Sequence, residues 1–113
     1  MQHLLRMRAL ALVVIGAITA GMVAGQWVAA PRSALLPLVI AYFLFNFGFV
    51  ITIGRSGSLT KATRLGMVAV LLNFAAMFLS SWDLVWTAAS AAAIAVAFAA
   101  AFMLLKEASI ATA

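Results

Sequence analysis

The chain has 113 residues, of which 68% are hydrophobic and 8% are charged, and its formal net charge is +5. A soluble domain of this length cannot bury so much apolar surface, because small domains keep a large share of their residues exposed. The composition therefore excludes an ordinary water-soluble fold and indicates one membrane domain over residues 1–113.

Four uncharged apolar runs are each long enough to cross a bilayer, which takes about 17–25 helical residues. They cover residues 9–30, 34–54, 65–81 and 84–105. In lipid the backbone must satisfy its own hydrogen bonds, and continuous apolar runs are typical of helices rather than barrel strands. Because the connections are short, we predict an all-α integral membrane protein with four transmembrane helices in an up-down antiparallel bundle.

Basic residues gather on one side of this predicted topology. That side carries Arg6, Arg8, Arg55, Lys61, Arg64 and Lys106, whereas the other side carries Arg32. The positive-inside rule then places both termini and the 55–64 loop in the cytoplasm, in a cell membrane that is most simply a bacterial inner membrane. Trp27, Trp82 and Trp86 fall at the opposite ends of the spans, as interfacial tryptophans do. We interpret the basic residues as topology signals, with a patch for lipid head groups or a partner as the alternative.

The first span carries a line of small residues, namely Ala17, Gly21 and Gly25, spaced by four. Such a line lets another backbone approach closely, from the same chain or from a second copy. The run also has the small residues of a signal-peptide cleavage site, with a cut after Gly25. It is longer than a signal peptide requires, so we expect it to remain as a membrane helix.

One amide lies in the middle of each of the two central spans. Asn46, within FLFNFGF, is nine residues before Arg55, and Asn73, within LLNFAAMF, is nine residues after Arg64. A helical rise of about 1.5 Å per residue puts both amides roughly 13–14 Å from the same boundary. Consecutive antiparallel helices can therefore bring the amides face to face, and Tyr42, one turn from Asn46, can join them.

Two interpretations of this polar cluster stay open. An interhelical hydrogen bond would fix the register and rotation of the two helices. Alternatively, the side chains would line a path for a substrate or an ion. Uncharged amides indicate function less strongly than an acidic residue within the membrane would, so we favour the structural interpretation.

The third span has one small-residue side. It consists of Gly66, Ala69, Asn73, Ala76 and Ser80, spaced by 3, 4, 3 and 4 residues. These positions share one side of a helix, and we expect that side to meet another helix. The fourth span is rich in alanine and can approach several neighbours, in this chain or in a partner.

Residues that carry catalysis or bind metals are scarce. The sequence has no cysteine, one histidine (His3) and two acids, Asp83 and Glu107, which fall on opposite sides of the membrane. Such acids cannot act as a pair, and no metal-ligand cluster or phosphate-binding glycine loop is evident. We therefore expect no enzyme, no cofactor, no metal site and no nucleic-acid partner.

The four-span layout is similar in size to that of the small multidrug exporters, but those carry an acid in the first span and this chain does not. No motif places the chain in a family. We expect a non-catalytic accessory or assembly subunit that packs with membrane lipid and other membrane helices, in a larger complex or a homo-oligomer. The alternative is a small homo-oligomeric transporter or channel that uses Tyr42, Asn46 and Asn73. A lytic or immunity-type membrane peptide fits the size alone.

Overall fold

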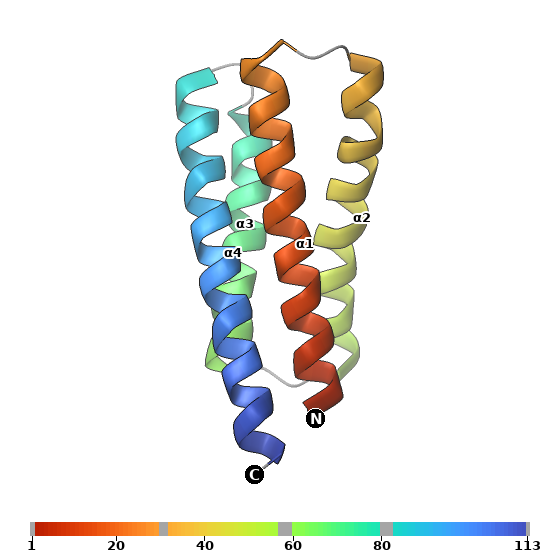
Figure 1. Cartoon of the computed structure of the whole chain (residues 1–113), viewed down its shortest axis with the longest axis vertical. Helices are drawn as coiled ribbons and strands as arrows, with labels where there is room; N and C mark the ends of the chain where they lie inside the picture. The colour runs from red at the N-terminus through yellow and green to blue at the C-terminus, as the bar shows by residue number, and fades with distance from the viewer. Residues whose placement is uncertain (1, 30–31, 57–59, 80–82, 113) are drawn as a thin grey trace.

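The computed structural model describes residues 2–29, 32–56, 60–79 and 83–112. Over these ranges the chain forms four helices, and they run alternately up and down (Figure 1). Each helix is long and apolar enough to span a membrane. The helices are α1 (Gln2–Trp27), α2 (Arg32–Ser56), α3 (Lys61–Phe78) and α4 (Asp83–Thr112).

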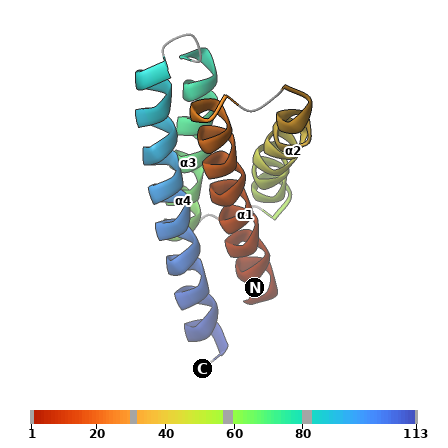
Figure 2. The ribbon, with the colours of Figure 1, turned by 45° about the horizontal axis from the view of Figure 1, so that its top comes forward.

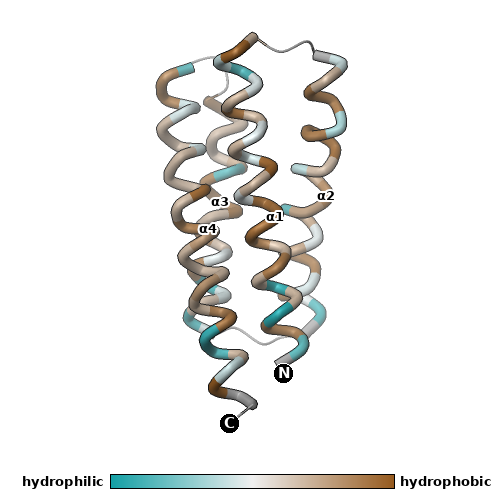
Figure 3. Tube along the Cα trace, in the orientation of Figure 1, coloured by the Kyte–Doolittle hydropathy of each residue, from teal (hydrophilic) through white to brown (hydrophobic). Residues whose placement is uncertain are grey.

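The two ends of the bundle differ in polarity. We call the end where α1 begins and α4 finishes the termini end, and the opposite end the far end (Figure 1). Hydrophilic residues gather toward the termini end of the helices, and apolar residues dominate their middle (Figure 3). At the far end two side-chain hydrogen bonds join α1 to the start of α4: Gln26 Nε2 donates to Asp83 Oδ1 at 3.3 Å, and Trp27 Nε1 donates to Thr87 Oγ1 at 2.8 Å.

The helices extend beyond the uncharged runs at the termini end. α1 begins at Gln2 rather than at residue 9, and α4 continues to Thr112 rather than ending at 105. Charged residues mark the ends of the uncharged runs in the sequence. They do not mark the ends of the helices, because Arg, Lys and Glu are good helix formers. At the start of α3, Thr60 is the N-cap, and its Oγ1 accepts the backbone N–H of Thr63 at 3.2 Å.

The helices do not pack equally on one another. α1 packs closely on α4 and on α2, and α3 packs closely on α4, whereas α2 is the least buried helix and stands apart from α3 and α4 (Figure 2). Long side chains bridge α2 to α3 instead: the rings of Phe47 and Phe74 lie 5.3 Å apart. The placement of α2 against α3 therefore depends on a few side chains rather than on a close backbone interface.

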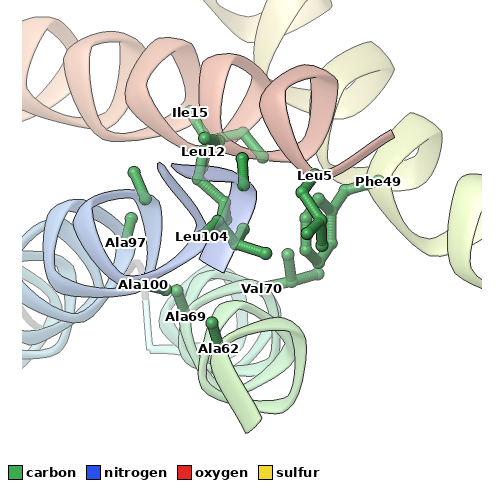
Figure 4. Packing of buried hydrophobic residues seen from close by; sticks show 13 residues of the cluster. Leu5, Leu12, Ile15, Phe49, Ala62, Ala69, Val70, Ala97, Ala100 and Leu104 are labelled. Carbon is green, nitrogen blue, oxygen red and sulfur yellow. The ribbon is translucent and has the colours of Figure 1, made fainter. Parts of the chain in front are cut away.

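The largest cluster of buried apolar side chains joins all four helices (Figure 4). α1 contributes leucine and isoleucine, α2 contributes Phe49, and α3 and α4 contribute mostly alanine. Alanine on α4 keeps that helix thin on its inner side, which allows it to pack against both α1 and α3. The labelled members are Leu5, Leu12, Ile15, Phe49, Ala62, Ala69, Val70, Ala97, Ala100 and Leu104.

The small side of α3 lies inside the bundle. Its described members Gly66, Ala69, Asn73 and Ala76 are all buried, while Ser80 lies outside the described residues. A Cβ atom added at Gly66 would lie 2.8 Å from Phe49 Cζ and 2.9 Å from Leu12 Cδ1. Glycine at this position therefore lets α1, α2 and α3 meet.

The small residues of α1 divide between two environments. Gly25 is buried, and a Cβ atom there would overlap Leu35 of α2; one at Gly21 would lie 3.5 Å from Leu38 Cδ1. Ala17 is exposed. Two of the three residues thus pack within the chain, against α2.

Candidate functional site

Four polar side chains from three helices form one buried group, which we call the polar layer: Thr19, Tyr42, Asn46 and Asn73. Asn73 Nδ2 donates to Asn46 Oδ1 at 3.2 Å. Asn46 Nδ2 in turn donates to the backbone oxygen of Tyr42 at 2.7 Å. The structure therefore brings together the three residues that the sequence singled out, and it adds a threonine from α1.

Asn73 is the centre of the polar layer. The Tyr42 hydroxyl donates to the backbone oxygen of Asn73 at 2.8 Å. The Thr19 hydroxyl lies 3.4 Å from Asn73 Oδ1 and 2.8 Å from the backbone oxygen of Ile15, so its proton is shared between an interhelical and an intrahelical acceptor. Hydrogen bonds at this single level thus tie α3 to both α1 and α2.

The amides are dry and bonded to protein groups. Asn46 is 0% exposed and Asn73 is 1% exposed. Each amide donates one hydrogen bond and accepts another within the bundle, and such buried, paired groups stabilise one arrangement of helices. The geometry supports a positioning role for the polar layer rather than a chemical one.

Sequence reasoning missed Thr19 because a threonine hydroxyl can bond within its own helix, which leaves no signal. Its spacing nevertheless carries information. The residues Leu5, Arg8, Leu12, Ile15 and Thr19 are separated by 3, 4, 3 and 4 positions and are all buried. The same spacing had identified the packed side of α3.

Arg8 is the second residue whose place the sequence did not reveal. It is 1% exposed, and its Nη1 donates to Thr63 Oγ1 at 3.1 Å. The Thr63 hydroxyl also lies 2.9 Å from Thr60 Oγ1, next to the start of α3. Arg8 thus joins α1 to the first turn of α3, in addition to contributing to the charge asymmetry.

Glu107 of α4 binds the same end of α3. Its Oε1 accepts the backbone N–H of Ala62 at 3.3 Å. An acid at a helix N-terminus satisfies an orphan amide and complements the helix dipole. Glu107 therefore fastens the extended last turns of α4 to the start of α3.

Cavities lie at two levels of the bundle, one at each end. The far-end cavity, of about 290 Å³, is lined by residues of all four helices, including Gln26, Tyr42 and Trp86. The termini-end groove, of about 500 Å³, is lined by apolar residues of α1 and α2 together with Arg8 and Thr52. Tyr42 is the polar-layer residue that borders the far-end cavity.

The described residues offer no group of three or more His, Asp or Glu side chains that could hold a metal ion. No protein-family model, no curated protein and no solved structure matches the chain.

Proposed function

We propose that the chain is a non-catalytic multi-pass protein of the cell membrane that acts as an accessory or assembly subunit. In this proposal it binds another membrane helix, from a second copy or from a larger complex. The basic residues at the termini end support an orientation with both termini in the cytoplasm.

The observation that carries this proposal is the outer side of α4. Four alanines there are exposed and nearly aligned along the helix: Ala88, Ala92, Ala95 and Ala99. Leu84, 77% exposed, and Phe102, 70% exposed, continue this line at its two ends. Helices in lipid associate by close packing of small residues, and this stripe leaves room for a partner backbone. We call it the alanine stripe.

The polar layer supports the same conclusion from inside the bundle. Its amides bond to each other and to the backbone, and they are not directed at the outer surface. A chain that pairs its two central amides inside the bundle and exposes a small-residue stripe fits a protein that works by packing.

The absence of cysteine from the sequence makes a cross-linking test direct. We expect Ala92→Cys on the alanine stripe, labelled with maleimide-benzophenone and irradiated in native membranes, to form an adduct with a neighbouring helix, because the photoreactive group requires no cysteine in the partner. Leu71→Cys is the matched control and should give none; Leu71 is 59% exposed and lies on α3. A doubled mass indicates a second copy, and another mass indicates a complex partner.

A second substitution tests whether the stripe drives association. Ala92→Leu fills the space that a partner backbone needs, so adduct formation from Ala95→Cys should be lost in that background. Equal adduct yields from Ala92→Cys and Leu71→Cys, or no adduct from either, would count against the proposal.

The transporter alternative has one specific observation in its favour, namely the far-end cavity that reaches Tyr42. Transport through this cavity predicts that Tyr42→Phe changes solute or ion flux in proteoliposomes by more than it changes stability. If the accessory function is correct, the same variant leaves liposome permeability at the protein-free level.

A further inference from the structure

The groove between α1 and α2 at the termini end is elongated along the two helices. It has a volume of about 500 Å³ and is lined from Leu4 to Val14 on α1 and from Leu44 to Thr52 on α2. Ten residues of helix rise about 15 Å, so the groove can hold an extended chain that lies along the helices. The polarity of its two ends indicates which chain that is.

Gly48 gives the groove its depth on the α2 side. A Cβ atom at Gly48 would have nothing within 4 Å. Leu44 and Phe45 lie one turn before it and Thr52 lies one turn after it, so the wall is apolar except at its termini end. A hydrocarbon chain would bury apolar surface against these residues and against Leu10 and Val14 of α1.

The termini end of the groove is positively charged. Arg8 lines this end of the groove. Arg55 lies three residues after Thr52 on α2, and the exposed Arg6 lies one turn before Leu10 on α1. Neither of the two acids in the sequence opposes this charge from the groove. Asp83 accepts a hydrogen bond at the far end, and Glu107 accepts one from the start of α3.

We propose that this groove binds one acyl chain of an anionic phospholipid, with the lipid phosphate beside Arg6 and Arg55. The apolar wall takes the acyl chain, and the two exposed guanidinium groups select a negatively charged head group. Arg8 adds a buried positive charge at the same level. This site lies on α1 and α2 and is separate from the alanine stripe of α4.

The test uses the full-length protein in detergent after removal of native lipid. Dioleoyl phosphatidylglycerol and dioleoyl phosphatidylcholine have the same acyl chains and differ in head-group charge. We expect native mass spectrometry to show one retained phosphatidylglycerol, with an affinity about tenfold above that for phosphatidylcholine. Phosphatidylglycerol should also raise the unfolding temperature, because a ligand that binds the folded state stabilises it.

Two glycine variants separate binding in the groove from general association with detergent-like molecules. Gly48→Leu fills the groove and should abolish the adduct. Gly54→Leu is the control, because a Cβ there also has nothing within 4 Å and the residue does not line the groove. Arg55→Gln should reduce the preference for phosphatidylglycerol while leaving weak binding of both lipids.

Equal binding of the two lipids, or an unchanged phosphatidylglycerol adduct in Gly48→Leu, would overturn the proposal. A protein dimer that displaces the lipid adduct and is lost in Gly48→Leu would also overturn it, since a second copy would then occupy the groove. If Gly48→Leu does not fold, the head-group preference of the unmodified protein and of Arg55→Gln decides the question.

Discussion

Asn73 of α3 donates a hydrogen bond to Asn46 of α2 at 3.2 Å, although the two helices have no close backbone interface. The Tyr42 hydroxyl adds a second bond across the same gap, to the Asn73 backbone oxygen. Since α2 packs closely only on α1, these bonds decide how α2 is rotated relative to α3. Packing on α1 thus places α2 in the bundle, and the polar layer helps to set its rotation relative to α3.

Asn73→Leu should lower the free energy of unfolding in detergent by about 1–3 kcal/mol, because it leaves the buried amide oxygen of Asn46 without its donor. Asn46→Leu should lower the free energy of unfolding by a similar amount. Thermal or denaturant unfolding of both variants measures the effect. Unchanged stability in both variants would show that the amides do not fix the helix register.

The double variant gives the strength of the Asn46–Asn73 bond itself. We expect it to be less destabilised than the sum of the single variants by roughly 0.6–1.7 kcal/mol, which runs from the average to the maximum for hydrogen bonds between membrane helices. Strict additivity would mean that each asparagine acts alone.

The pairing of Asn46 with Asn73 followed from counting residues to a shared loop, because antiparallel helices of equal rise place such residues at equal depth. The four helices followed from the lengths of the uncharged runs, because lipid leaves the backbone few other structures. Both inferences rest on geometry that any apolar helix obeys. They required no knowledge of which side chains touch.

Other features depend on rotation and helix order, which composition does not determine. Arg8 looked like a topology signal because it precedes an uncharged run, but α1 begins earlier and turns Arg8 toward α3. Ala17 is exposed although Gly21 and Gly25 pack against α2. Residues spaced by four turn by about 40° per step around a helix, so Ala17 lies about 80° from Gly25.

Gly66 and Gly48 form a matched pair for testing close packing. Gly66→Ala should lower the free energy of unfolding by about 1–3 kcal/mol, because its Cβ would press on the buried side chains of Phe49 and Leu12. A Cβ atom at Gly48 has nothing within 4 Å, so Gly48→Ala should raise the free energy of unfolding by about 0.5–1 kcal/mol, because alanine has the higher helix propensity. Equal changes in unfolding free energy for the two variants would contradict the close approach at Gly66.

Glu107→Ala should lower the free energy of unfolding by about 1 kcal/mol, because the Ala62 N–H at the start of α3 loses its acceptor. Glu107→Gln keeps an acceptor oxygen and should lose less. The exposed neighbour Lys106 is the control, and Lys106→Ala should change stability by less than about 0.5 kcal/mol. Denaturant unfolding of the three variants measures the contribution of the cap.

Arg8 and Arg6 carry the same charge two residues apart, so they separate a structural role from a topological one. Each substitution to alanine removes one positive charge from the same end, and a topology reporter fused to the C-terminus should respond equally to both. Stability should respond unequally. Arg8→Ala loses the bond to Thr63 and the packing of a buried side chain, which should lower the free energy of unfolding by about 2–3 kcal/mol.

Arg6 is exposed, so Arg6→Ala should change the unfolding free energy by less than about 0.5 kcal/mol. Thr63 keeps its contact with Thr60 in both variants, so a difference in unfolding free energy between them comes from Arg8. If the two variants unfold at the same denaturant concentration, Arg8 acts only as a topology signal. A larger loss for Arg8→Ala with an unchanged reporter orientation would establish that this charge is held inside the bundle because it joins α1 to α3.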